Sequence, residues 1–184
     1  MSGRCVVQTI ESPIGPLITA ATADGVCLLE FSGPQRLEVQ LAALRRHITA
    51  EPVHGMNGHL ERLHAELTDY FAGRLTRFTV PLLTPGTPFQ EKVWAELLRI
   101  PYGETRSYEE IACAVSSITA QRAVGRANGT NRIAIVVPCH RVVNKDGKLG
   151  GYGGELWRKE MLLGLERTGT LTPVRRVAAQ TPLF

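Results

Sequence analysis

IAIVVPCHRVVN, residues 133–144, sets the thiol of Cys139 directly beside an imidazole and a guanidinium, behind an apolar run. A free thiol has a pKa of about 8.5, so only a small fraction is the nucleophilic thiolate at neutral pH. A neighbouring base or cation raises that fraction, and the motif therefore indicates an activated cysteine. The alternative is that Cys139 is a small apolar residue ending a buried strand, because unpaired cysteines are commonly buried. These residues alone leave both interpretations open.

The rest of the chain is typical of an ordinary globular protein. Its 184 residues are 43% hydrophobic and 21% charged, enough for one large or two small domains. No apolar run approaches the ~20 residues that span a bilayer, and the N-terminus has no signal-sequence pattern. We therefore expect a protein that does not bind a membrane and that lies in the cytoplasm, or in the nucleus if it comes from a eukaryote. The net charge of +4 permits contact with nucleic acid without requiring it.

The cysteines show no metal-binding or disulfide pattern. They are scattered along the chain as Cys5, Cys27, Cys113 and Cys139, without the short spacings of a zinc site. A reducing compartment is expected, because a reactive thiol survives there.

The first half, residues 1–80, is predicted to be an α/β domain. Extended runs at residues 6–10, 17–23 and 26–31 are separated by turn signals, which indicates a small antiparallel sheet. Leucines recur at helical spacing from Leu37 to Ile48 and again from Leu60 to Phe71. The intervening residues 50–58 contain one proline and two glycines and are predicted to form a loop.

Residues 81–88 are predicted to be a linker, and residues 89–168 a mainly helical domain. Thr87-Pro88 is typical of a helix start, Ser107 and Glu110 have capping-box spacing, and Thr119 is expected to cap a third short helix over residues 120–128. Short helices joined by a tight turn indicate a helix-turn-helix. A glycine-rich loop at 147–154 precedes a last helix that carries Glu166, and residues 169–184 are expected to form a loose tail.

The third short helix combines arginines with small residues. Arg122 and Arg126 lie one turn apart, as do Ala123 and Ala127, with Gly125 between them. Small side chains allow close approach to the narrow minor groove of a duplex, where the arginines can pair with phosphates or enter the base stack. A tightly packed internal helix crossing explains the same residues, and both interpretations stay open here.

Taken together, these motifs resemble the O6-alkylguanine-DNA alkyltransferases, the methylated-DNA-protein-cysteine methyltransferases. The resemblance is dense from about Phe89 to Glu166 and weak before Pro88. Its motifs are Pro101-Tyr102-Gly103-Glu104-Thr105, Ser107-Tyr108, Arg122-Ala123-Val124-Gly125, Asn131, Pro138-Cys139-His140-Arg141-Val142, Gly151-Tyr152-Gly153-Gly154 and Glu166.

The resemblance implies a fold and a set of roles. The fold would be a ribonuclease-H-like α/β domain followed by a winged helix-turn-helix-like domain. Cys139 would accept the alkyl group, with His140 as its base, Glu166 orienting the imidazole, and Tyr108 donating to the leaving guanine. Asn131 would tie the helix-turn-helix to the active-site segment. The base pocket would be formed by Val142, Tyr152, Gly153 and Gly154, and duplex DNA would be contacted by Ser107, Arg122, Ala123, Gly125, Arg126 and Ala127.

The resemblance implies that the partner is double-stranded DNA, bound through its minor groove with the O6-alkylguanine flipped out. The protein would act as a monomer. Whether it binds DNA cooperatively and whether it acts on O4-alkylthymine stay open. No cofactor is expected. Some relatives hold zinc in the first domain, but here only Cys5 and Cys27 match, so no metal is expected. A DNA-binding regulator with an inert Cys139, and a cysteine hydrolase using Cys139, His140 and Glu166, are the alternatives.

Overall fold

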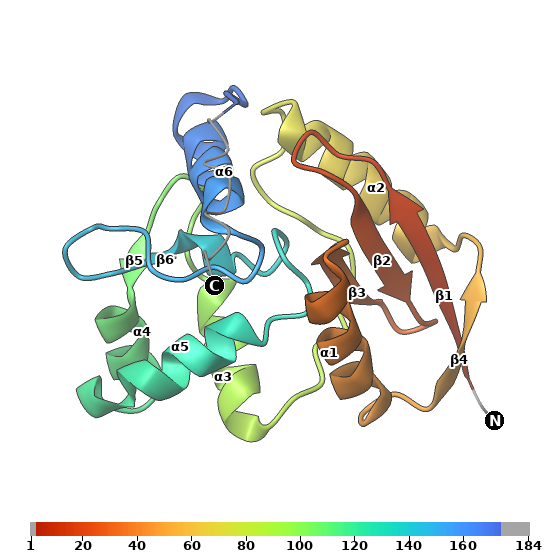
Figure 1. Ribbon diagram of the computed structural model, residues 1–184, viewed down its shortest axis with the longest axis horizontal. Coiled ribbons are helices and arrows are strands. Elements are labelled where there is room, and N and C mark those ends of the chain that lie inside the picture. Colours follow the sequence, from red (N-terminus) through yellow and green to blue (C-terminus); the bar gives the residue numbers. More distant parts are fainter. Residues whose placement is uncertain (1–2, 174–184) are drawn as a thin grey trace, which may run out of the picture.

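The computed structural model describes residues 3–173, and the tail predicted to be loose lies largely outside them. A four-stranded sheet forms most of the first half (Figure 1). Its strands are β1 (Gly3–Ile10), β2 (Leu17–Ala21), β3 (Val26–Phe31) and β4 (Ala50–His54), in the spatial order β3-β2-β1-β4. As the turn signals predict, β1–β2 and β2–β3 pair antiparallel.

The fourth strand corrects the sequence-based prediction. Residues 50–54 were expected in a loop, but they form β4, which pairs in parallel with β1 and makes the sheet mixed. The strand has a mostly exposed pattern, with Glu51 and Pro52 facing solvent, so it lacks the alternation that reveals a strand in sequence. Proline is tolerated there because β4 is an edge strand with one unpaired side.

Two helices cover opposite faces of this sheet. On one face, α1 (Pro34–Arg45) contributes Leu37, Leu41 and Leu44 to a small core. On the other, α2 (Gly58–Phe71) buries its leucines against β2 and β3, in a core that continues into the second half of the chain. Asn57 caps α2 by accepting a hydrogen bond from the Leu60 backbone N–H at 3.0 Å.

The helices of the second half begin where local cap chemistry predicts. Both α3 (Pro88–Leu97) and α4 (Tyr108–Val115) have complete capping boxes, at Thr87 and at Ser107. The prediction for α5 (Gln121–Gly129) was wrong in one detail. Thr119 does not cap it, because residues 118–120 form a 3₁₀ turn, η1, whose last residue, Ala120, is the N-cap of α5.

The apolar run before Cys139 is not a strand. Ile133 makes a single bridge with Leu29, and the chain then turns at once, with a hydrogen bond from Val137 N to Ile133 O at 2.9 Å and Ile135 in the left-handed region at φ 71°. Cys139 begins a 3₁₀ turn, η2 (Cys139–Arg141), which leads to β6 (Val142–Val143) and finally α6 (Leu156–Thr168). β6 pairs in parallel with β5 (Arg106–Ser107).

The outer edge of β3 joins the two halves. Val26 exchanges hydrogen bonds with Pro81 and Leu83 at 2.9 and 2.8 Å, so the segment predicted to be a linker is held against the sheet. Further along the strand, Leu29 exchanges hydrogen bonds of 2.8 Å with Arg132 and Ala134. These contacts cover an otherwise open edge and fix the segment that leads to Cys139 relative to the sheet. Within residues 3–173, no helix is long and apolar enough to cross a membrane.

Candidate active site

The side chain of Asn131 contacts the sulfur of Cys139 and helps to position it. The Asn131 amide Nδ2 donates to Cys139 Sγ at 3.1 Å and to the Val137 carbonyl at 2.8 Å, while its Oδ1 accepts from Ile133 N at 3.0 Å. Asn131 is 2% exposed, so these hydrogen bonds form in a dry environment where each is hard to replace. The sequence grouped Asn131 with Cys139 only through the family resemblance, and the structure brings the two side chains into contact.

A buried carboxylate is the centre of a second network. Glu166 Oε1 accepts from His140 Nε2 at 2.7 Å, Tyr70 Oη at 2.7 Å and Arg141 Nη2 at 3.0 Å. Its Oε2 accepts from Arg141 Nε at 2.9 Å and from the Gly103 backbone N–H at 3.1 Å. Five donors therefore converge on one carboxylate, and the buried negative charge is balanced by the guanidinium of Arg141.

The network fixes the protonation states of both partners. Burial alone raises the pKa of Glu166, but hydrogen bonds from His140 and Arg141, together with the positive charge of Arg141, outweigh it and hold that pKa well below its ordinary value. The pKa of His140 is lowered, chiefly because the ring is completely buried, although Glu166 opposes the shift. His140 therefore rests as a neutral imidazole beside an ionised carboxylate, which is the resting state of a general base.

The orientation of the imidazole follows from this pairing. Because Glu166 engages Nε2, the proton-accepting position left on the ring is Nδ1. Among the described residues, His140 Nδ1 is buried and has no hydrogen-bond partner. The ring is thus oriented with one nitrogen anchored and the other available for proton transfer.

Two members of this network were not predicted from the sequence. Arg141, besides binding Glu166, donates from Nη1 to the Ile100 carbonyl at 2.6 Å, which joins the segment that follows α3 to η2. Tyr70 lies in the helix predicted from Leu60 to Phe71, but sequence analysis assigned it no separate role. Its hydroxyl, 96 positions away in sequence, reaches Glu166. Only the adjacency of Arg141 to the Cys-His pair gave a sequence signal.

A cavity of about 340 Å³ opens beside Cys139. Its size lies at the small end of the ~300–1,000 Å³ typical of small-molecule sites. The cavity is lined by Tyr108, Gly125, Asn128, Gly129, Cys139, Gly151, Tyr152 and Gly153. Cys139 is only 4% exposed overall, but it forms part of this wall and is reached through the cavity.

Tyr108 stands in the cavity wall as a hydrogen-bond donor. Its Oη donates to the Gly151 carbonyl at 3.4 Å, a long and readily exchanged bond. The pKa of Tyr108 is raised by burial, with a smaller contribution from the negative charge that Cys139 carries when ionised. The hydroxyl therefore stays protonated at neutral pH and can donate to a bound ligand.

The glycine loop is only partly in the cavity. Of the four predicted pocket residues, Tyr152 and Gly153 line it, whereas Val142 and Gly154 lie outside the lining. Val142 is buried in β6, and its carbonyl accepts from Lys159 Nζ at 2.6 Å. Gly154 packs against Phe31, so that an added Cβ would stand 2.3 Å from the ring.

Lys159 is a buried cation that sequence analysis missed, and its pKa responds to burial and to the charge of Cys139. It is 0% exposed, and its ammonium donates to the Val142 carbonyl at 2.6 Å and to the Gly150 carbonyl at 3.4 Å. Desolvation lowers its pKa from 10.5 to about 8, while the charge of Cys139 favours the protonated form. Its signal was the spacing Lys159, Leu162, Glu166 on one face of α6.

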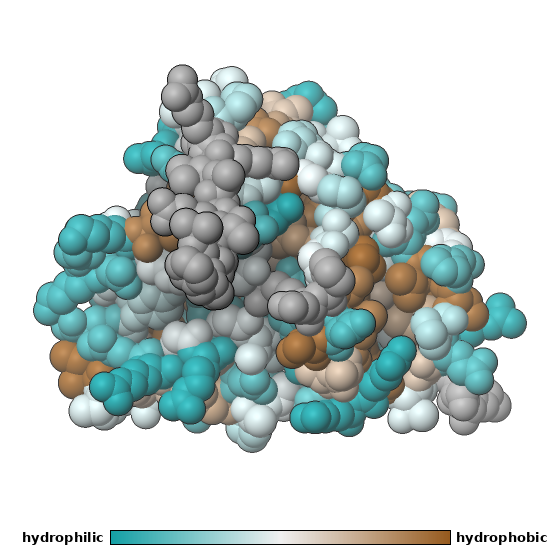
Figure 2. All heavy atoms as spheres, viewed as in Figure 1, coloured by the Kyte–Doolittle hydropathy of each residue, from teal (hydrophilic) through white to brown (hydrophobic). Residues whose placement is uncertain are grey.

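The predicted DNA-contacting residues divide between surface and core. Arg122 and Arg126 are exposed on α5, and Gly125 lines the cavity between them. Ala123 is half-buried, whereas Ala127 is 3% exposed and its carbonyl accepts from Trp94 Nε1, so it faces the core. Figure 2 shows hydrophilic side chains gathered over the region of α4 and α5.

Ser107, the other residue predicted to contact DNA, caps α4. Its Oγ accepts from the Glu110 backbone N–H at 3.2 Å and donates to Glu110 Oε2 at 2.7 Å. The side chain is half-buried at the start of the helix-turn-helix.

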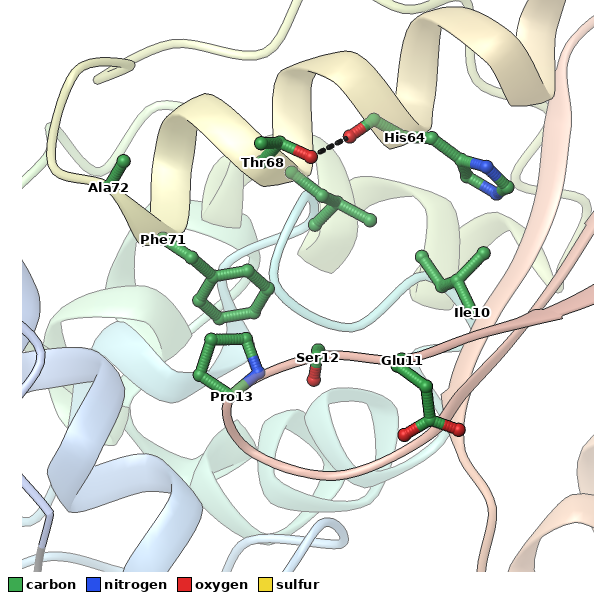
Figure 3. A pocket seen from close by; sticks show the side chains of 9 residues that line it. Ile10, Glu11, Ser12, Pro13, His64, Thr68, Phe71 and Ala72 are labelled. Carbon is green, nitrogen blue, oxygen red and sulfur yellow. Dashed lines mark hydrogen bonds between the residues drawn. The ribbon is translucent and has the colours of Figure 1, made fainter.

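Two other features of the first half lack the chemistry of this site. A cavity of about 410 Å³ lies between the β1–β2 loop and α2 (Figure 3), lined by His64 and Phe71 but by no nucleophilic thiol. Cys5 and Cys27 lie 3.8 Å apart, Sγ to Sγ, in the core beneath α1. Among the described residues, no three metal-ligating side chains gather in one place.

The fold and the cysteine site together define a class of protein. Two family models match the chain: the 6-O-methylguanine DNA methyltransferase ribonuclease-like domain over residues 5–84, and the DNA-binding domain of the same proteins over residues 88–168. The chain belongs to the 6-O-methylguanine DNA methyltransferase family.

Individual relatives agree with the family models. The chain is 49% identical over 161 residues to the methylated-DNA--protein-cysteine methyltransferase of Mycobacterium tuberculosis, covering 88% of this chain and 92% of that one. The constitutive Bacillus subtilis protein of the same name is 42% identical over 160 residues, or 86% and 93% of the two chains. The crystal structure of M. tuberculosis OGT in complex with DNA superposes with a TM-score of 0.75 at 45% identity, covering 92% and 96%.

Proposed function

We propose that this protein repairs alkylated DNA by direct reversal, moving an alkyl group from O6 of guanine to Cys139. Family membership assigns the chain the activity for which its relatives are named, methyl transfer from DNA to a protein cysteine. The observation that carries the residue assignment is the cavity beside Cys139, which has the thiol in one wall and the donor Tyr108 in another.

The proton balance follows from the His140 network. The thiol proton passes to His140, directly or through one water, and the imidazolium that forms is stabilised by the ionised Glu166. Asn131 Nδ2, 3.1 Å from Cys139 Sγ, stabilises the thiolate by donating to it. Arg141 and Tyr70 keep the carboxylate in place throughout.

The transfer itself exchanges one bond for another. Sulfur forms a bond to the alkyl carbon while the bond from that carbon to guanine O6 breaks, and the electron pair stays with the base. A hydrogen bond from Tyr108 stabilises the charge that develops on guanine, and the proton taken from the thiol restores a neutral base. The product at Cys139 is a thioether, which thiol exchange does not reverse. One molecule therefore repairs one lesion.

DNA binding accompanies this chemistry, and we assign it to α5. The helix carries two exposed arginines, Arg122 and Arg126, before and after Gly125, which lines the cavity. We propose that α5 enters the minor groove of a duplex, that the damaged nucleotide flips into the cavity, and that Arg122 fills the gap it leaves. The protein is expected to act as a monomer in a reducing compartment such as the cytoplasm, where the Cys139 thiol stays reduced.

An intact-mass measurement tests the reaction. Incubation with a duplex containing one O6-benzylguanine should add one benzyl group per protein molecule, located to the Cys139 peptide. Cys139→Ser should abolish transfer while duplex binding persists, because a hydroxyl is a far weaker nucleophile than a thiolate. Cys113→Ser, which removes the exposed thiol of α4, is the matched control and should react at the wild-type rate.

The contrary result is equally distinct. A protein that binds the duplex but stays unmodified after prolonged exposure would be a DNA-binding regulator whose thiol is inert.

A further inference from the structure

An aromatic residue of the first half packs against the active-site loop. Phe31, the last residue of β3, is 2% exposed, and its ring stands edge-on to Tyr152 with the centroids 6.2 Å apart. An added Cβ on Gly154 would lie 2.3 Å from Phe31 Cε2 and 2.9 Å from Tyr152 Cε1. Since Tyr152 lines the cavity, one side of the cavity wall is backed by a residue of the N-terminal sheet.

A guanidinium holds this contact in place. Arg158 lies between two rings, 4.6 Å from the centroid of Phe31 and 4.4 Å from that of Trp157. It also donates from Nε to the Ile14 carbonyl at 2.8 Å and from Nη1 to the Gly154 carbonyl at 3.0 Å. The sheet, the loop and α6 are thus joined at one point, and the Phe31 ring cannot move without breaking these contacts.

The other end of the loop is fixed just as tightly. An added Cβ on Gly150 would lie 2.8 Å from the Tyr108 ring, and Lys159 donates to the Gly150 carbonyl. The cavity-lining residues 151–153 therefore span two supports, one on α4 and one on β3. The support on α4 is Tyr108, the hydrogen-bond donor of the proposed reaction, whereas the support on β3 is Phe31, which takes no part in that chemistry.

We propose that Phe31 determines the size of the alkyl group the site accepts, by setting how far Tyr152 and the loop stand from Cys139. This inference rests on the proposed function, because it concerns the group that is transferred. A smaller residue at position 31 lets the loop move back toward the sheet and enlarges the space beside the sulfur. A larger residue at position 154 pushes the loop away from Phe31 and narrows that space.

Two opposite substitutions and their combination test the proposal. Duplexes carrying one O6-methylguanine or one O6-benzylguanine are the substrates, and the benzyl-to-methyl ratio of single-turnover rates is the readout. Phe31→Leu should raise this ratio about tenfold, the scale at which a pocket discriminates by one or two carbon atoms. Gly154→Ala should lower it by a similar factor. The double variant should return toward the wild-type ratio, because the leucine leaves room for the added methyl group.

The ratio distinguishes specificity from general damage. Leu44→Ala, in the separate core beneath α1, is the control for a destabilised N-terminal half, and it should leave the ratio unchanged. Thermal unfolding shows that each variant is folded at the assay temperature. Ratios that stay at the wild-type value in both single variants, or that shift in the same direction, would overturn the role of Phe31. A wild-type protein that accepts neither group would instead refute the proposed function itself.

Discussion

The buried network around Glu166 and the outer face of α5 lie in the same half of the chain, but charged side chains are buried and paired in the first and exposed in the second. At the centre, His140 and Glu166 are buried, and five donors satisfy the carboxylate. On α5, Arg122 and Arg126 are exposed, and among residues 3–173 neither forms a salt bridge. The charges of the centre are paired within the protein, whereas the α5 arginines are exposed and can contact the DNA phosphates of the proposed function.

This difference separates two kinds of consequence. Removing a member of a buried charge network leaves its partner uncompensated, so stability and chemistry fall together. Removing an exposed arginine changes stability little and weakens only the steps that involve DNA. Substitutions in the two regions should therefore differ in which measurement they move.

Glu166→Gln should have the largest effect on both measurements. The change leaves the Arg141 guanidinium buried without a counter-charge and removes the anion that stabilises protonated His140. We expect a loss of about 3–5 kcal/mol in unfolding free energy. The rate of alkyl transfer should fall by about 10²–10⁴-fold, the range of a general base. Urea unfolding and single-turnover transfer measure the two quantities.

Glu160→Gln is the control for Glu166→Gln, since Glu160 is an exposed carboxylate on the same helix and should change neither quantity. A Glu166→Gln protein of wild-type stability would contradict the structure of the buried network.

Arg122→Ala should move only the DNA-dependent step. Flipping a nucleotide costs a few kcal/mol, and an inserted arginine offsets part of it, so transfer from duplex DNA should fall about 10–100-fold. Transfer from free O6-benzylguanine needs no flipping and should stay near the wild-type rate. Arg45→Ala, which removes a basic residue from α1, controls for net charge. Equal losses on the duplex and on the free base would remove the proposed role of Arg122.

Local chemistry explains which parts of the fold could be predicted. The starts of α3 and α4 were predicted correctly because Thr87 and Ser107 carry their cap partners within three residues. β4 was missed because its partner, β1, is distant in sequence and its own residues are mostly exposed. The 3₁₀ turn before α5 was missed because Thr119 suits a cap as well as a turn.

The site shows the same limit. Cys139 and His140 are adjacent, and the family resemblance linked them to Glu166. Tyr70 and Lys159 were missed because each follows an apolar helical stripe, and the periodicity that buries a side chain does not reveal where its polar tip ends. Phe31 likewise reads as an ordinary strand residue. The surroundings of the reactive segment come from contacts across the two halves of the chain.

The pH dependence of stability should report the buried pair. The folded-state pKa of His140 lies below its ordinary 6.5, so as pH falls through that value the unfolded chain gains a proton that the folded protein does not. Stability should therefore decline as pH drops below about 6.5. The folded-state pKa of Glu166 is also lowered, so its contribution is fully present above its ordinary 4.5 and is lost as pH falls further.

Urea unfolding at several pH values, compared with His140→Gln, measures the first decline. That variant should remove part of the decline between about pH 6.5 and 5, and the part that remains is expected from His64, whose pKa is also lowered by burial. An unchanged slope would mean that His140 is not held neutral in the folded protein.

Tyr70→Phe should have the smallest effect, and it tests how the N-terminal half supports the centre. The variant removes one of the five donors to Glu166 and keeps the ring that packs against Phe78 and Tyr102. A hydrogen bond to a charged group is worth about 1.5–3 kcal/mol, and four donors remain, so we expect a loss of unfolding free energy near the lower figure. Tyr102→Phe is the matched control, because its hydroxyl makes only a 3.4 Å contact with the Leu165 carbonyl and its loss should cost less.

Alkyl transfer by Tyr70→Phe should fall less than by Glu166→Gln, since His140 and Arg141 still hold the carboxylate. A loss as large as that of Glu166→Gln would mean that the tyrosine, rather than Arg141, fixes the carboxylate, and the centre would then depend on the N-terminal half for its chemistry as well as for its shape.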